Sequence, residues 1–348
     1  MKYGYLSFGR NPAQSRDQYG NLGDWYQSFA VQTLFRKMGI PESQQQAVDR
    51  TGITTYRGER TRLVLQGCFL HMKGAPVFPV SADIDPCFFG FHCLSALDRR
   101  GIAALPDDLL IGCRDEATYR RMQKLGKRAF LSGCLSLILD RRPAAPENGK
   151  VFLVDAPREV EKYIPAHLRE RIEYVSQSCR LNREWDDRET HDRLRKKAEE
   201  TLAKYRDEAL LVVTSRLHVA SPCTALGVPV ILARNYFDER YAWIDKFLPL
   251  YTPDRFGEID WDVQAPDLEA HKKRVLETAA ACVENSPDAA RLADELTAFY
   301  LDRTRGEIHK PIYVKAYHFL QGTAPKTADF CREKLLQKFT VETSRNKE

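Results

Sequence analysis

The apolar residues of this 348-residue chain fall into short β-branched runs separated by stretches with helical spacing. Residues 209–233 show the pattern most clearly. The run at residues 210–213 is typical of a strand buried in a parallel sheet, and residues 228–232 form a second such run. Between them the spacing predicts a short helix from Val219, with Pro222 in its first turn and Gly227 at its end. Strand, helix and strand in this order predict a βαβ unit.

The same alternation runs along most of the chain. It predicts further strands at residues 2–8, 62–66, 109–112, 129–139, 151–154 and 172–176, and further helices at residues 25–38, 115–125, 186–206, 271–285 and 288–303. Residues 141–149 carry prolines, charges and a closing Asn-Gly, which is typical of a linker. We therefore expect an α/β protein with one domain at residues 1–145, a second at 146–285, and C-terminal helices with a basic, aromatic tail at 286–348.

Composition narrows the class of protein. Hydrophobic residues make up 43% of the chain and charged residues 29%, so we expect a globular rather than a disordered protein. A net charge of +5 and a pI near 8.6 are too mildly basic for a dedicated nucleic-acid binder, but they suit an anionic small molecule or an anionic membrane face. The sequence shows neither a signal peptide nor a long apolar span, and its nine cysteines then favour a reducing, cytoplasmic setting.

Charged side chains follow two of the predicted strands, at the point where each strand ends. Arg216 and His218 come after residues 210–213, and Arg114 comes after residues 109–112. In open α/β sheets, ligands bind beyond the carboxyl ends of strands, where helix N-termini also point. This placement favours an anion such as a phosphate or a carboxylate. The alternative stays open that Arg216 forms a structural ion pair and that His218 caps its helix.

Two further regions carry residues of the kinds that bind ligands or metals. The glycine-bearing turn at residues 20–24 separates the first predicted strand from the first predicted helix, which is the layout of a ligand loop, although Asp24 could equally be the N-cap of that helix. Between residues 68 and 93 lie cysteines and histidines whose spacing matches no strong zinc pattern. We predict no metal there but a buried aromatic strand and loop, with His92 facing a pocket.

Several of these motifs together resemble the polysaccharide pyruvyl transferase family. They are GNLGD at residues 20–24 followed by a helix with Gln27, LVLQGCF at 63–69, GCRDEAT at 112–118, SGCLSL at 132–137 and TSRLHVASPCTALGVPVIL at 214–232. The resemblance covers roughly residues 1–249, and the chain after residue 305 has no counterpart in it.

The resemblance implies two Rossmann-like domains that face each other across a cleft, similar to glycosyltransferases of the B type. It also implies a pyruvyltransferase that moves a pyruvyl group from phosphoenolpyruvate to a sugar of a polysaccharide or glycan precursor, usually as a ketal, with no cofactor or metal. Arg114, Arg216 and His218 match positions that hold the phosphate and carboxylate of this donor. The predicted catalytic residues are His218, with Asp24 and Asp115 as second choices. The other predicted substrate-binding residues are Asn21, Gln27 and His92.

Two other functions stay open at this point. One is a glycosyltransferase on the same frame, whose nucleotide-sugar diphosphate would meet the same helix N-termini. The other is a non-catalytic, sugar- or surface-associated protein in which the basic tail matters most. The acceptor is expected to be a sugar or a lipid-linked or nucleotide-linked glycan precursor, and the sequence leaves the choice open. It also leaves open a peripheral contact of the basic tail with the inner face of a membrane.

Overall fold

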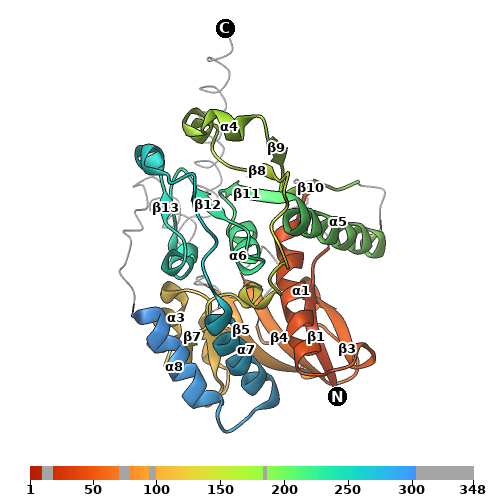
Figure 1. The fold of residues 1–348 in the computed structure, drawn as a ribbon. Helices are drawn as coiled ribbons and strands as arrows, with labels where there is room; N and C mark the ends of the chain where they lie inside the picture. Colours follow the sequence, from red (N-terminus) through yellow and green to blue (C-terminus); the bar gives the residue numbers. More distant parts are fainter. Residues whose placement is uncertain (10–18, 70–77, 94–98, 183–185, 303–348) are drawn as a thin grey trace, which may run out of the picture.

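The computed structural model describes residues 1–9, 19–69, 78–93, 99–182 and 186–302. Its strands form two parallel sheets, one in each half of the chain (Figure 1). The first has the order β3-β1-β4-β5-β6-β7, and the second has the order β13-β12-β11-β8-β9. The predicted α/β class with two Rossmann-like units is therefore confirmed. The predicted domain boundaries at residues 145 and 285 stay a prediction.

The strands of the first sheet follow the apolar runs of the sequence. They are β1 (Lys2–Ser7), β3 (Gln45–Asp49), β4 (Thr61–Cys68), β5 (Ile84–His92), β6 (Ile111–Cys113) and β7 (Ala129–Leu131). Those of the second sheet are β8 (Lys150–Val154), β9 (Ile172–Val175), β11 (Ala209–Thr214), β12 (Val230–Ala233) and β13 (Leu250–Tyr251). The central strands are buried on both faces, which explains why each carries a continuous apolar run instead of alternating apolar and polar residues.

Helices cover both sheets and meet between them. Those of the first half are α1 (Leu22–Lys37), α2 (Arg99–Ala103) and α3 (Glu116–Lys124), and those of the second half are α4 (Ala166–Arg169), α5 (Asp187–Glu208), α6 (Leu217–Ala225), α7 (Glu269–Glu284) and α8 (Ala289–Leu301). Helix α1 packs against α5, α6 and the 3₁₀ turn η5 (Leu135–Ile138), so one hydrophobic core continues from the first sheet to the second. This shared core fixes how the ends of the two sheets face each other.

A short antiparallel pair joins the halves a second time. Strand β2 (Tyr19–Asn21) pairs with β10 (Ser178–Arg180), and the backbone N–H of Leu22 donates to the carbonyl of Gln177 at 3.0 Å. The glycine-bearing turn predicted as a ligand loop is therefore held by the second half of the chain. Helix α1 begins directly after it, with Asn21 rather than Asp24 as its N-cap residue.

The last two helices return to the first sheet. Helix α8 packs against β7, and α7 packs against η5 and β5 (Figure 1). Arg62 on β4 ties them down, because its guanidinium donates to the carbonyl of Cys282 at 2.6 Å and to the side chain of Asn285 at 2.5 Å. Asn285 is the left-handed residue that ends α7. A cation thus closes the C-terminus of this helix, where backbone carbonyls lack partners.

Two local predictions are wrong for identifiable physical reasons. The strand expected at residues 129–139 ends at Leu131, because Gly133 takes a positive φ of 63° and the chain then forms η5. Helix α6 begins at Leu217, so Pro222 lies inside it and not in its first turn.

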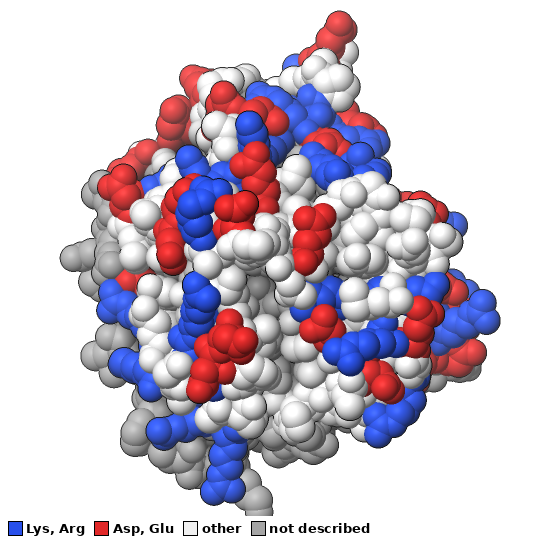
Figure 2. All heavy atoms as spheres, turned by 90° about the horizontal axis from the view of Figure 1, so that it is seen from below, with Lys and Arg blue, Asp and Glu red and all other residues white. Residues whose placement is uncertain are grey.

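Charge on the described surface is mixed. On the face shown in Figure 2, basic and acidic side chains are interspersed, in keeping with the small net charge of +5. Within the described residues, none of the helices combines the length and the apolar character that crossing a membrane requires. The basic tail lies outside the described residues.

Candidate functional site

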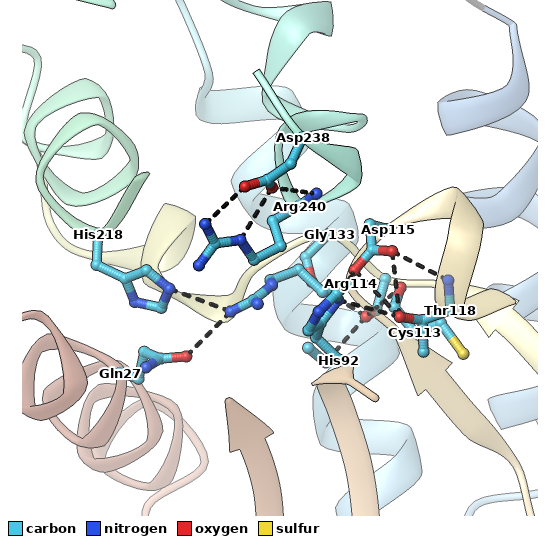
Figure 3. A network of polar contacts seen from close by, with 12 residues as sticks. Gln27, His92, Cys113, Arg114, Asp115, Thr118, Gly133, His218, Asp238 and Arg240 are labelled. Carbon is cyan, nitrogen blue, oxygen red and sulfur yellow. Dashed lines mark hydrogen bonds and ion pairs between the residues drawn. The ribbon is translucent and has the colours of Figure 1, made fainter. Parts of the chain in front are cut away.

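Side chains from both halves of the chain converge where the strands of the first sheet end (Figure 3). Arg114 follows β6 directly, and His218 lies in the first turn of α6, after β11 of the second sheet. The Nη1 atom of Arg114 lies 3.1 Å from Nε2 of His218. The sequence prediction that these two side chains meet thus agrees with the geometry, and we call the set Gln27, Arg114, His218 and Arg240 the Arg114 centre.

Arg114 is a buried cation with little to neutralise it. Its side chain is 1% exposed, and besides His218 its Nη1 has only the Gln27 side-chain oxygen, at 3.5 Å. Its Nε has no hydrogen-bond partner, and no carboxylate among the described residues forms an ion pair with it. A buried charge is costly unless it is paired. The arrangement therefore favours an anion that completes the site.

His218 is held as a neutral imidazole. Its Nδ1 donates to the backbone carbonyl of Gly23 at 3.2 Å, which leaves Nε2 to accept from Arg114. Burial and the positive charges of Arg114 and Arg240 hold the pKa of His218 well below its usual range. A neutral imidazole can take up a proton at Nε2 when a ligand replaces the contact with Arg114.

The first turn of α1 forms one wall of the centre. Asn21 caps this helix, because its side-chain oxygen accepts from the N–H of Gly23 at 3.1 Å. Gln27 points into the centre and also donates to Asp24 at 3.4 Å. Burial raises the pKa of the Asp24 carboxyl, although the charges of Arg50 and Arg114 partly offset the rise. Of these predicted site residues, Gln27 contacts Arg114, and Asp24 lies beside Gln27.

His92 and Asp115 form a buried pair on the other side of Arg114. The Nδ1 of His92, the last residue of β5, donates to the Asp115 carboxylate at 2.5 Å. Asp115 also caps α3 by accepting from the N–H of Thr118 at 3.0 Å. Burial would lower the pKa of His92, but Asp115 and the thiol of Cys68 outweigh it and raise that pKa to about 9. His92 is therefore protonated at neutral pH.

Arg216 does not join the Arg114 centre. Its Nε donates to the Asp155 carboxylate at 2.7 Å, and its side chain is 48% exposed. Arg216 is also the N-cap residue of α6, so it lies at the same helix N-terminus as His218. The structural ion pair that the sequence left open is thus present, and the role of Arg216 in donor binding stays a prediction.

Arg240 also belongs to the Arg114 centre, although it is not among the site residues predicted from the sequence. It lies in the 3₁₀ turn η7 (Glu239–Tyr241) and pairs with Asp238 through two contacts, at 2.7 Å and 2.9 Å. Figure 3 shows its guanidinium beside His218 and Arg114. The signal in the sequence was a charged pair shortly after the carboxyl end of β12.

No metal centre is seen in the part of the chain that the structure describes, since no three His, Cys, Asp or Glu side chains there are arranged to hold an ion. His71, which the sequence grouped with Cys68 and His92, lies outside the described residues. Cys87, another member of that group, is buried in the first sheet and takes part in its core.

A comparison with models of known protein families gives a match that contains the residues at these strand ends. Residues 77–236 match the family described as polysaccharide pyruvyl transferase. The resemblance inferred from the motifs is confirmed over this stretch, which includes His92, Arg114, Arg216 and His218. The match supports a transferase that moves pyruvyl groups to polysaccharide.

Comparisons with individual proteins add less. No curated protein matches the chain. Among solved structures, a functionally uncharacterised protein from Klebsiella pneumoniae is 15% identical, with a TM-score of 0.40 over 68% of this chain and 87% of its own. A UDP-N-acetylglucosamine 2-epimerase is 11% identical, with a TM-score of 0.38 over 89% and 99%. A putative enzyme of that name from Listeria monocytogenes is 11% identical, with a TM-score of 0.37 over 89% and 100%.

Proposed function

We propose that this protein transfers a pyruvyl group from phosphoenolpyruvate to two hydroxyls of a sugar in a polysaccharide or glycan precursor, forming a ketal. The observation that carries the proposal is the buried guanidinium of Arg114, which has an unpartnered Nε and faces a neutral His218. Phosphoenolpyruvate bears a carboxylate and a phosphate close together. It would supply the negative charge that this cation lacks within the described residues.

Donor binding is assigned to the cations around this point. Arg114 would bind one acidic group of the donor, and Arg240 and the N-terminus of α6 would bind the other. Each charge-assisted hydrogen bond to such a group contributes about 1.5–3 kcal/mol. Arg216 remains a candidate at the rim, where it would have to leave Asp155 or share it with the donor. Because fixed cations carry the charge, the proposal needs no cofactor or metal.

Proton transfer is assigned first to His218. A site acid protonates the methylene carbon of the donor as one sugar hydroxyl adds to the central carbon and gives its proton to His218 Nε2. Phosphate then leaves with the C–O electrons as the second hydroxyl closes the ketal, and the proton of that hydroxyl leaves with the phosphate. A positioned base of this kind contributes about 10²- to 10⁴-fold to the rate. Asp24, whose carboxyl has a raised pKa, is a second acid–base group beside Gln27. Asp115 acts through His92, which holds its carboxylate.

The proposal is tested by turnover with the purified protein. Phosphoenolpyruvate and a panel of lipid-linked and nucleotide-linked glycan precursors should release phosphate and give a new pyruvyl methyl signal in the proton NMR spectrum of the product. His218→Asn should retain donor binding and lose turnover. Stabilisation of the protein by nucleoside diphosphates but not by phosphoenolpyruvate would favour the glycosyltransferase alternative and contradict the proposal.

A further inference from the structure

Cys68 occupies a position that neither the predicted site nor the core explains. It is the last residue of β4, and the strand register places it directly beside His92, the last residue of β5. Its side chain is half-buried, whereas most of the other described cysteines are buried. Its carbonyl is fixed by the guanidinium of Arg50 at 2.7 Å. The thiol is thus held at the carboxyl end of the first sheet, beside the Arg114 centre.

His92 connects this thiol to a carboxylate. The Nδ1 of His92 donates to Asp115 at 2.5 Å, which leaves Nε2 for the thiol of Cys68, its neighbour in the strand register. The three side chains come from the ends of three neighbouring strands, since Asp115 follows β6. A nucleophile, a histidine and an orienting carboxylate in this order form the arrangement that activates a thiol or hydroxyl in many enzymes.

The surroundings favour the ionised thiol. Burial would raise the pKa of Cys68, but His92, Arg114 and Arg240 outweigh it and lower that pKa to about 7. In contrast, burial raises the pKa of Cys87 to about 11 and raises that of Cys179. Thiolates, not thiols, act as nucleophiles. Cys68 and Cys179 are both partly exposed, but only Cys68 has cationic neighbours that lower its pKa below the ordinary value.

We infer that Cys68, His92 and Asp115 form a nucleophilic triad at the donor site, and that Cys68 Sγ bonds covalently to the central carbon of the enolpyruvyl donor. The inference rests on the proposed function and deepens it. Arg114 has an unpartnered Nε, and its positive charge lies close enough to Cys68 to act on the thiol. An anion bound to Arg114 would therefore lie next to the thiolate.

The covalent step balances with the groups present. The bond from Sγ to C2 forms as the electrons of the C2–C3 double bond take the Nε2 proton of His92 at C3, and the phosphate stays on C2. Phosphate then departs with the C2–O electrons as one acceptor oxygen bonds to C2. Finally the thiolate departs with the S–C2 electrons as the second acceptor oxygen bonds. His218 Nε2 takes one hydroxyl proton and the other leaves with the phosphate, and exchange through solvent then releases the proton of His218 and restores that of His92.

The triad itself is tested by alkylation of the full-length protein with iodoacetamide across neutral pH, with peptide mass spectrometry to locate the label. Cys68 should react with a midpoint near pH 7, and phosphoenolpyruvate should protect it. In His92→Gln the midpoint should rise toward that of an ordinary thiol, about 8.5. Cys179→Ser is the matched control and should leave the Cys68 profile unchanged. A Cys68 midpoint at about 8.5 in the unchanged protein would overturn the inference.

The covalent role is tested separately. Acid-quenched protein should carry a mass increase of one phosphoenolpyruvate on Cys68, and Cys68→Ala should lose about 10²-fold or more of its turnover while phosphoenolpyruvate still stabilises it. Full turnover in Cys68→Ala would overturn the inference and leave the proposed function standing. If the unchanged protein neither binds nor consumes phosphoenolpyruvate, the proposed function fails and the covalent step fails with it, while the alkylation profile still reports whether the triad exists.

Discussion

The Nη1 atom of Arg114 lies 3.1 Å from Nε2 of His218, although 104 residues separate them in the chain. Arg114 belongs to the first sheet and His218 to the helix that follows a strand of the second. Their contact therefore joins the carboxyl ends of both sheets, where α/β proteins bind ligands. It also places a buried, unneutralised cation next to a neutral base, and most of the predictions below follow from that pairing.

The protonation state of His218 should respond to charge at the Arg114 centre. Because burial and two neighbouring cations lower its pKa, His218 should stay neutral near pH 6.5 in the free protein. Bound phosphoenolpyruvate adds negative charge and should raise that pKa, and so should Arg114→Gln, which removes a cation. NMR titration of the imidazole checks both shifts. An ordinary titration of His218 near pH 6.5 in the free protein would contradict the geometry.

Gly23 should tolerate no side chain, although it lies inside a helix. A Cβ added there would come within 2.7 Å of the Cβ of His218, which cannot swing away. Gly23→Ala should therefore displace α6 from α1 and lower turnover by about 10²-fold, the usual cost of moving a catalytic group by about 1 Å. Gly52→Ala is the control, since nothing lies within 4 Å of its added Cβ. Equal kinetics in the two variants would show that the close approach is unimportant.

Arg240 should contribute more to donor binding than Arg216. Arg240 holds Asp238 through two contacts and lies beside His218, whereas Arg216 is half-exposed and paired with Asp155. Lysine lacks the planar fork of arginine. Arg240→Lys should therefore weaken phosphoenolpyruvate binding by about tenfold or more, and Arg216→Lys should weaken it less. Calorimetric titration of both variants decides the order, and the reverse order would restore Arg216 as the main donor residue.

Arg62 should matter for stability and not for chemistry. It is 4% exposed, pairs with Asp85, and holds the C-terminal end of α7 through three further contacts. Arg62→Met should lower the free energy of unfolding by about 1–3 kcal/mol, because it leaves the half-buried Asp85 carboxylate and the helix carbonyls without their cation. Chemical denaturation measures the loss. The exposed neighbour Arg60→Met should be nearly neutral, and similar losses in the two variants would count against this anchoring role.

Much of this arrangement could be predicted from the sequence. Most of the buried parallel strands carry continuous apolar runs, so their positions were visible, whereas the mixed strand β3 and the two-residue strand β13 were not predicted. Charged residues directly after the predicted strands had to lie at the ligand-binding edge. Arg114, His92 and His218 were found in this way, and the structure places all three there. The motifs added the resemblance to a family, and the model of that family matches residues 77–236.

The features that the sequence did not predict depend on contacts between distant residues, which leave no local pattern in the sequence. Strands β2 and β10 have three residues each, too short for a period-two signal, so their pairing across the two halves was missed. The spacing of Cys68 and His92 suggested at most a weak metal pattern, because their adjacency comes from the register of two parallel strands. Arg240 lies in an irregular segment, where the charge of a residue does not indicate which way its side chain points.

The central claim is that Arg114 binds the acidic donor, and calorimetric titration of phosphoenolpyruvate tests it most directly. The account predicts saturable binding to the unchanged protein, affinity reduced about 10- to 100-fold in Arg114→Lys, and no change in Arg120→Lys, an exposed arginine on the following helix. Binding of phosphoenolpyruvate that is equally strong in Arg114→Lys, or absent from the unchanged protein, would contradict it.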